Sequence, residues 1–226
     1  HTMGDESLLS DEGKRRMQQL LWVEDPESDT GEARGYGLGL VIERIDDRKI
    51  VGHSGGYPGH ITQTLWDPAT GLSVSALTNA LGGAAGEITV GMMRLLLAAG
   101  GPDVADEKPD EALDPFTGRF VNAWGVADVV RLGGSLKELR PAAADPMAGA
   151  VPLSVDGDAL RIDGGTGFGA IGERLEFVRD DSGAVVRVQG GGGQTLLPVA
   201  AALALLANDP AALIGGSGGG SGGASA

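Results

Sequence analysis

The stretch GHSGGYPG, residues 52–59, decides how the first half of this chain is expected to fold. It lies between two apolar runs, residues 36–45 before it and residues 72–79 after it, and this predicts a strand edge. Glycine has no Cβ atom, so consecutive glycines let a strand backbone approach a substrate closely. His53 adds an imidazole that can change its charge near neutral pH, and Ser54 adds a neighbouring hydroxyl.

The residues around this stretch predict short strands with a helix at either end. Ser10 is a suitable N-cap, and apolar residues at helical spacing extend the first helix to residue 21. A second helix is predicted over residues 87–99, because Gly100 and Pro102 follow it. The strands predicted between the helices are residues 36–45, 50–54, 61–66 and 72–78, with a hairpin turn at residues 46–49.

A charged segment, residues 102–115, is predicted to be a linker between residues 1–101 and a second domain, residues 116–200. In the second domain, short alternating runs are separated by turn signals such as Asp156-Gly157, which is typical of a small antiparallel sheet or barrel. Residues 201–226 combine an Ala/Leu segment that suits a helix with a Gly/Ser tail that we expect to be disordered. The six strands expected in the second domain are residues 126–132, 151–155, 159–162, 174–179, 184–189 and 195–199.

Four short sequence motifs occur in the first half, between about residue 7 and residue 97. Their order and spacing together are more specific than any one of them alone. They are Leu8-Leu9-Ser10, Tyr36-Gly37-Leu38-Gly39, His53-Ser54-Gly55 with the glycine turn after it, and Leu77-Thr78-Asn79. Together they resemble the penicillin-recognising serine hydrolases, which include class C β-lactamases, D-aminopeptidases and related esterases. The triplet His53-Ser54-Gly55 corresponds to the family's third motif, Lys-Thr-Gly in many β-lactamases. Histidine at the first position is more similar to the aminopeptidase and esterase branches.

The resemblance implies an α+β fold: the C-terminal portion of a β-lactamase/transpeptidase-like domain, an antiparallel sheet with flanking helices, followed by a small antiparallel β domain. It also implies acyl transfer from an amide, lactam or ester through an acyl-enzyme. In the family, the position of His53 faces the nucleophile and helps hold the substrate, and the backbone N–H at Gly56 contributes to the oxyanion hole. Ser54, Gly55 and Tyr57 are then substrate-binding parts of the same wall.

Two further motifs of the family are absent from the chain. No serine has a lysine three residues later, as Ser-x-x-Lys requires, and neither Tyr36 nor Tyr57 begins a Tyr-x-Asn motif. We therefore expect a C-terminal part of a serine hydrolase that is inactive alone, because the nucleophile and its base belong to an N-terminal catalytic half. The expected partners are that missing half and a small-molecule or peptide-like amide or ester substrate.

Composition narrows the remaining function classes. The formal net charge is -14, so the basic surface that nucleic acids require is not expected. The absence of cysteine excludes disulfides, thiolate catalysis and Cys-ligated zinc. His53 and His60 have no acidic residue at a known ligand spacing, so neither a metal nor a cofactor is expected. No apolar run approaches the ~20 residues that span a bilayer, and the compartment stays open.

Other interpretations remain open from the sequence. His53 also suits a packing role, Ser54 a solvent-facing position, and Gly55 and Gly56 a bulge or a turn. The chain is alternatively a non-catalytic binding or pseudo-enzyme module, or an engineered fragment or permutant whose Gly/Ser tail once joined the missing half. A Ser-x-x-Lys and a Tyr-x-Asn encoded upstream would decide in favour of the enzyme.

Overall fold

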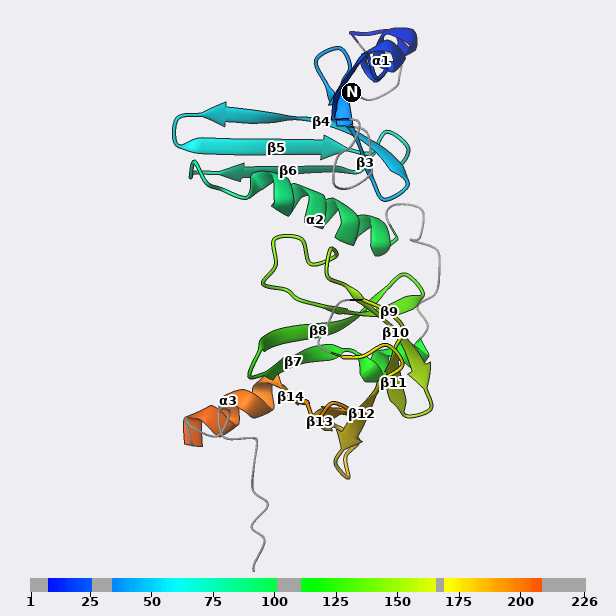
Figure 1. Ribbon diagram of the computed structural model, residues 1–226, viewed down its shortest axis with the longest axis vertical. Helices are drawn as coiled ribbons and strands as arrows, with labels where there is room; N and C mark the ends of the chain where they lie inside the picture. The colour runs from blue at the N-terminus through cyan, green and yellow to red at the C-terminus, as the bar shows by residue number, and fades with distance from the viewer. Residues whose placement is uncertain (1–7, 26–33, 101–110, 166–168, 209–226) are drawn as a thin grey trace, which may run out of the picture. The chain divides into compact units, whose positions relative to one another are not determined.

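The chain divides into two compact units, residues 1–108 and residues 109–226 (Figure 1). The first unit contains one open sheet with helices α1 and α2, and the second contains a closed barrel with helix α3. The computed structural model describes residues 8–25, 34–100, 111–165 and 169–208.

Six antiparallel strands form the sheet of the first unit, and each pairs with its neighbours in sequence. Helix α1, Asp11–Met17, precedes the sheet, and the Ser10 hydroxyl caps it by accepting a hydrogen bond from the Gly13 N–H at 3.1 Å. Helix α2, Ala85–Ala98, follows the sheet. The strands are β1 Trp22–Asp25, β2 Arg34–Tyr36, β3 Val41–Ile45, β4 Arg48–Tyr57, β5 His60–Trp66 and β6 Ser73–Thr78.

Two-residue turns set the register of the central strands. Asp46 and Asp47 connect β3 to β4, and Asp46 has a φ of 53°. Pro58 and Gly59 connect β4 to β5, and Gly59 has a φ of 86°. Proline followed by a residue with positive φ is the combination that a type II turn uses, so Gly59 suits its position.

Helix α2 packs against β5 and β6 and covers one face of the sheet. The buried core beneath it contains Ile45, Ile50, Leu65 and Met93, and Met93 comes from the helix itself. Because side chains alternate along a strand, the residues of β4 that share this face are Ile50 and its even-numbered neighbours. The odd-numbered residues of β4 lie on the opposite face.

The second unit is an antiparallel barrel of eight strands that follow one another in sequence order and close through the pairing of β14 with β7. The 3-10 helix Glu111–Phe116 precedes the barrel, and α3, Val199–Asn208, follows it. The strands are β7 Gly118–Asn122, β8 Gly125–Leu132, β9 Ser135–Leu139, β10 Val151–Asp156, β11 Ala159–Ile162, β12 Arg174–Arg179, β13 Val185–Gly190 and β14 Thr195–Pro198.

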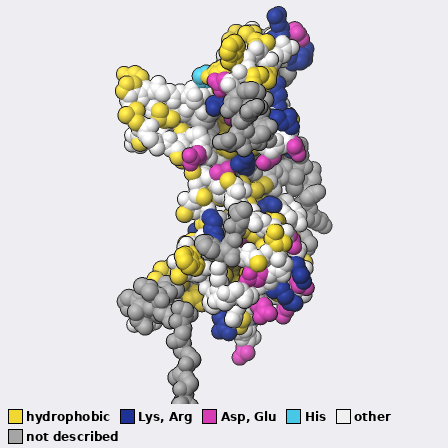
Figure 2. Space-filling model, viewed as in Figure 1, with side chains coloured by type: hydrophobic (Ala, Val, Ile, Leu, Met, Phe, Trp, Pro, Cys, Tyr) yellow, Lys and Arg dark blue, Asp and Glu magenta, His cyan; other side chains and the backbone are white. Residues whose placement is uncertain are grey.

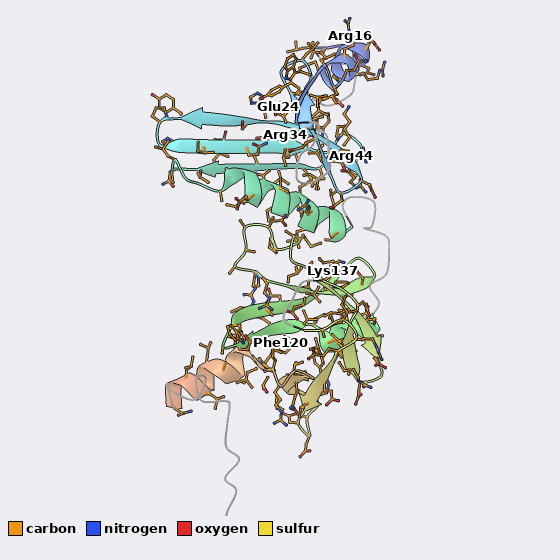
Figure 3. All side chains as sticks on the ribbon, viewed as in Figure 1. Arg16, Glu24, Arg34, Arg44, Phe120 and Lys137 are labelled. Atoms are coloured by element: carbon orange, nitrogen blue, oxygen red, sulfur yellow. The ribbon has the colours of Figure 1, made fainter. Side chains whose placement is uncertain are left out.

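Side chains fill the interior of the barrel. Phe116 and Phe120 meet the ring of Phe177 edge-on, with centroid distances of 5.3 Å and 5.9 Å. Figure 3 labels Phe120. A cavity lined by Glu138, Glu173 and neighbouring residues encloses only about 20 Å³, which is room for about one water molecule. The buried apolar residues packed around these rings are Val129, Leu136, Val151, Leu153, Leu160, Ile162, Leu175 and Val188.

The predicted α+β class is wrong. The described residues form fourteen strands but only three α-helices, so the protein is mostly β, with a six-stranded sheet and a closed barrel in place of a β-lactamase-like α+β domain. The prediction undercounted strands: β1, β7 and β9 were not expected, and Lys137 and Glu138 in β9 are good helix formers. The single strand predicted over residues 36–45 is divided, since β2 ends at Tyr36 and β3 begins at Val41. Helix α1 is also shorter than predicted and ends at Met17.

Several predicted segments lie partly outside the described residues. Residues 101–110, most of the predicted linker, are among these, and so is the Gly/Ser tail. The helix expected in the Ala/Leu segment is present as α3 and begins at Val199. Among the described helices, none combines the length and the apolar character needed to cross a membrane.

Candidate functional site: the open edge of strand β4

The candidate site lies where β4 extends beyond its neighbour β3 (Figure 1). Strand β3 pairs with β4 only as far as the pair Val41–Gly52. Strand β5 pairs with β4 as far as Tyr57–His60, at the end of the hairpin. Over residues 53–57, the side of β4 that faces away from β5 therefore has no strand partner in the described part of the chain. We call this side the open edge of β4.

The open edge presents the backbone groups of Ser54 and Gly56. Tyr57 and His60 flank a two-residue turn, so they form a hydrogen-bonded pair. Hydrogen-bonded and non-hydrogen-bonded pairs alternate along an antiparallel ladder, so every second residue counted back from Tyr57 is bonded to β5. The N–H and C=O groups of Ser54 and Gly56 consequently point toward the open edge. The Gly56 N–H is a donor without a ladder partner, which is what an oxyanion donor requires.

His53 lies exposed on β4 beside this edge. Its Nδ1 is 2.5 Å from the Ser54 carbonyl oxygen, and a carbonyl only accepts, so Nδ1 holds the proton of this hydrogen bond. The neutral ring then has Nε2 as an acceptor, and the protonated ring has Nε2 as a second donor. The Tyr36 ring packs against the imidazole with a centroid distance of 5.9 Å and an interplanar angle of 66°. These two contacts fix the ring next to the open edge.

The predicted site residues are divided between the two faces of the sheet. His53, Gly55 and Tyr57 alternate with Ser54 and Gly56, so the two sets point to opposite faces. The Ser54 side chain lies on the face that α2 covers further along the sheet, whereas the imidazole lies on the other face. The structure therefore brings His53 together with the backbone of Ser54, and not with its hydroxyl.

The two glycines differ in what surrounds them. A Cβ atom added at Gly55 would lie 2.5 Å from the Thr62 Oγ1, which no side chain tolerates without a shift. At Gly56 the nearest atom would be the Ile61 Cδ1 at 3.8 Å, an ordinary contact. Each glycine pairs with one residue of β5 without a register shift, so the alternative of a bulge or turn at these positions is wrong. Gly55 is needed for packing, whereas the structure leaves room for a side chain at Gly56.

Tyr57 projects from the end of the hairpin and is 76% exposed. Its cross-strand partner His60 is also exposed, on the same face. Neither side chain has a described partner that would hold it over the open edge. Tyr57 therefore forms the outer limit of the candidate site.

Residues that the sequence analysis did not single out also belong to this surface. Thr64 lies directly opposite His53, and its Oγ1 is 2.9 Å from the Ser75 Oγ on β6. Both hydroxyls share the face of the imidazole and extend it into a polar row across three strands. The turn at residues 58–59 sets the register of β4 against β5, so counting strand positions from that turn would have placed Thr64 opposite His53.

Within the described ranges, no three His, Asp or Glu side chains gather closely enough to hold a metal ion. The chain also has no cysteine. The chemistry available at the open edge is therefore that of backbone N–H groups, an imidazole and hydroxyls.

Comparison with known proteins gives only distant similarities. No family model matches the chain, and no curated protein matches it. Among solved structures, the chain is similar to the octameric penicillin-binding protein homologue from Pyrococcus abyssi, with 23% identity and a TM-score of 0.38 over 85% of this chain and 43% of that chain.

Two structures of SurE show a similarity of the same order. The structure of SurE with D-Leu has 20% identity and a TM-score of 0.31, over 84% of this chain and 44% of that chain. A second SurE structure has 21% identity and a TM-score of 0.30, over 84% of this chain and 43% of that chain. The chain spans less than half of each of these proteins, and scores this low support no conclusion about its activity.

Proposed function

We propose that this chain supplies one wall of the acyl-transfer site of a serine hydrolase that acts on amide, lactam or ester carbonyls. In this proposal it is related to the D-aminopeptidase and esterase branch of the penicillin-recognising enzymes. The observation that supports the proposal is the Gly56 N–H, which points out of the open edge of β4 next to the ordered imidazole of His53.

The Gly56 N–H acts as one oxyanion donor in the proposed reaction. When a serine Oγ attacks the substrate carbonyl, the electron pair of the C=O bond moves onto oxygen, and an N–H fixed at that position stabilises the new charge. Collapse of this intermediate expels the amine or alcohol and leaves an acyl-enzyme, which water then hydrolyses. Each such donor is typically worth ~10²–10³ in rate. The serine and its base come from outside this chain.

His53 has a positioning role in the proposed site. Because its Nδ1–H donates to the Ser54 carbonyl, its Nε2 is the atom available to a substrate. A protonated ring donates from Nε2 to a substrate carboxylate or carbonyl, and it adds a positive charge to the site. Gly55 places no side chain beside the imidazole, so a substrate can lie along the strand there. Tyr57 limits the site at the hairpin end.

The experiment uses this chain joined to, or coexpressed with, the polypeptide encoded upstream of it. We expect hydrolysis of D-amino acid p-nitroanilides, p-nitrophenyl esters or a chromogenic cephalosporin. In that protein His53→Ala lowers kcat/KM by roughly 10–10³, as expected for the loss of one oriented hydrogen-bonding group.

His60→Ala is the matched control, because this second exposed imidazole lies on β5, beyond the turn, and its backbone pairs with Tyr57 on the side of β4 away from the open edge. It is expected to leave kcat/KM unchanged. Circular dichroism must show that both variants are folded. A folded His53→Ala variant with full activity would contradict the proposed role of the imidazole.

A non-catalytic binding module is the second candidate, and one observation favours it. The open edge presents alternating N–H and C=O groups, which can pair with an extended peptide without any chemistry. This function predicts that the joined protein binds a peptide and releases it uncleaved. Turnover of any of the substrates above excludes it.

A further inference from the structure

A second possible site lies elsewhere in the first unit, in a groove between α1 and strands β3 and β4. The groove is open to solvent and has a volume of about 760 Å³, within the ~300–1,000 Å³ of small-molecule sites. Lys49 is an odd-numbered residue of β4, so the groove lies on the sheet face opposite α2. The residues that line it are Arg15, Gln18, Gln19, Leu20, Leu21, Ile42, Glu43, Arg44 and Lys49.

Two like charges face each other on the strands beneath this groove. Arg44 on β3 and Lys49 on β4 are direct cross-strand partners. Like charges in this arrangement destabilise an antiparallel pair. Neither cation has a carboxylate within 4.0 Å in the described part of the chain, although the sequence contains 31 acidic and 17 basic residues. Each cation donates to a backbone carbonyl, but neither of these bonds neutralises its charge, and a local conflict of this kind is expected at functional sites.

Both cations retain donors for a ligand. The Arg44 Nη2 donates to the Asp47 carbonyl oxygen at 2.7 Å, and the Lys49 Nζ donates to the Gln18 carbonyl oxygen at 2.6 Å. Each bond uses one N–H group. The Arg44 guanidinium has five N–H groups and the Lys49 ammonium has three, so both retain donors. Partial burial lowers the pKa of Lys49 from its ordinary value, because desolvation disfavours the charged form. A bound anion would compensate for that lost hydration.

The other charged groups of the groove are already paired. Arg15 lies 3.3 Å from Glu12, one turn earlier on α1. Glu43 lies 3.9 Å from Arg34 on β2. Among the described residues of the groove, the charge without an ion-pair partner is therefore positive and comes from Arg44 and Lys49. Figure 2 shows basic side chains gathered on the side of the first unit that carries α1, and Figure 3 labels Arg44 within this region.

The remaining wall of the groove is apolar. Ile42 forms a buried part of it, with 7% exposure. Leu20 and Leu21 line it from the segment after α1 and are 43% and 59% exposed. An apolar group lying on these leucines would remove their surface from water, which is favourable by roughly 25 cal/mol per Å².

We propose that this groove binds a small amphipathic anion, with its acidic group between Arg44 and Lys49 and its apolar tail on Leu20 and Leu21. The acidic group is a carboxylate or a phosphate at the end of an alkyl chain. The site is independent of the proposed hydrolase function, because none of its lining residues belongs to the open edge of β4.

The test is isothermal titration calorimetry on the chain as it is, with probes below their micelle-forming concentrations. Decanoate and decyl phosphate are the amphipathic anions, and comparing them distinguishes the two acidic groups. Decanol has the tail without the charge, and inorganic phosphate has the charge without the tail. We expect at least one amphipathic anion to bind with a Kd at least tenfold lower than either control probe.

The variants separate binding from folding. The double variant Arg44→Gln/Lys49→Gln is expected to weaken binding at least tenfold while its Tm stays equal or rises, because the like-charge repulsion is gone. Arg16→Gln makes a single charge change on the exposed part of α1 outside the groove lining, and it is expected to leave binding unchanged. Leu21→Ser keeps both cations and is expected to weaken decanoate binding but not that of inorganic phosphate.

Three outcomes would overturn the proposal. The first is equal affinity for decanol and decanoate, which would remove any role for the cations. The second is unchanged binding by the folded double variant or, if that variant does not fold, by Leu21→Ser. The third is binding to phosphatidylglycerol vesicles that falls equally in Arg16→Gln and in the double variant, with no binding of free decanoate. That result would indicate a general surface attraction and not a groove.

Discussion

Proline substitutions at Gly55 and Gly56 test the orientation of the β4 backbone on which the candidate site depends. The Gly56 N–H points to the open edge, so Gly56→Pro removes no ladder bond, and the nearest atom to an added Cβ would be 3.8 Å away. Proline is tolerated at edges of this kind. Gly55→Pro removes an N–H bonded to β5, leaves a carbonyl unpaired and brings the ring against Thr62, where an added Cβ would lie at 2.5 Å.

The two changes should therefore differ strongly in free energy of unfolding. A buried carbonyl left without a donor costs about 1–3 kcal/mol, and the lower part of that range applies here because Thr62 is only half-buried. With the clash at Thr62, a loss of about 2–4 kcal/mol is expected for Gly55→Pro. For Gly56→Pro we expect the free energy of unfolding to change by no more than about 1 kcal/mol. Proline restricts the unfolded chain, which stabilises the fold, and this partly offsets the cost of adjusting the backbone to the proline ring. In the joined protein, Gly56→Pro should still lower kcat/KM by ~10²–10³, as loss of an oxyanion donor does.

Urea unfolding followed by tryptophan fluorescence measures the difference, with Trp124→Phe as the background. Trp124 belongs to the barrel and is 68% exposed, so its removal leaves Trp22 and Trp66 to report on the sheet. A separate transition for the first unit then gives its own midpoint. If Gly56→Pro destabilises the sheet as much as Gly55→Pro, the Gly56 N–H is bonded within the ladder, and the inferred oxyanion donor does not exist.

The remaining predictions concern stability and reactivity. Asp67→Ala should destabilise the first unit by about 2–4 kcal/mol in urea unfolding, because this carboxylate is 1% exposed and accepts hydrogen bonds from Arg48, Ala69 and Thr70 at 2.9–3.1 Å. Asp67→Asn should lose less free energy of unfolding, and an unchanged urea midpoint for both variants would contradict this prediction. Backbone N–H groups, first that of Gly192, donate to the Glu173 carboxylate and lower its pKa below the ordinary 4.5. The carboxylate therefore stabilises the fold above pH 4.5, and this stabilisation is lost as the pH falls through the lowered pKa. In thermal unfolding, Glu173→Gln should lose less stability below about pH 5 than the parent chain, and parallel curves for the two proteins would exclude a stabilising role of the carboxylate. The chain alone should form no covalent adduct with a fluorophosphonate or a reactive β-lactam in intact-mass analysis; stoichiometric labelling would reveal an activated serine within it.

Much of the first unit could be predicted from its sequence, because local signals dominate there. The strands at residues 61–66 and 72–78 and helix α2 alternate or repeat clearly, and the turn at residues 46–49 has suitable polar residues. The end of β4 could not be placed. Glycine disfavours strands, so the prediction ended the strand at Ser54, whereas pairing with β5 extends it to Tyr57.

The barrel was harder to predict because its closure is non-local. Strand β7 is short and begins with Gly118, and its partner β14 lies at the other end of the unit's sequence. A local pattern cannot indicate such a pair. The same limit applies to the candidate site: His53 and Gly56 were named from sequence, but the packing of Tyr36 against the imidazole depends on the fold.

The pairing of β14 with β7 also has a consequence for aggregation. In the described part of the second unit, every barrel strand pairs with two neighbours, although β14 pairs with only two residues each of β13 and β7. Loss of β14 by proteolysis or early termination would expose two edges at once, one on β7 and one on β13. Each edge is a template for pairing with another copy. We therefore expect the four residues Thr195–Pro198, which close the barrel, to limit its pairing with other copies.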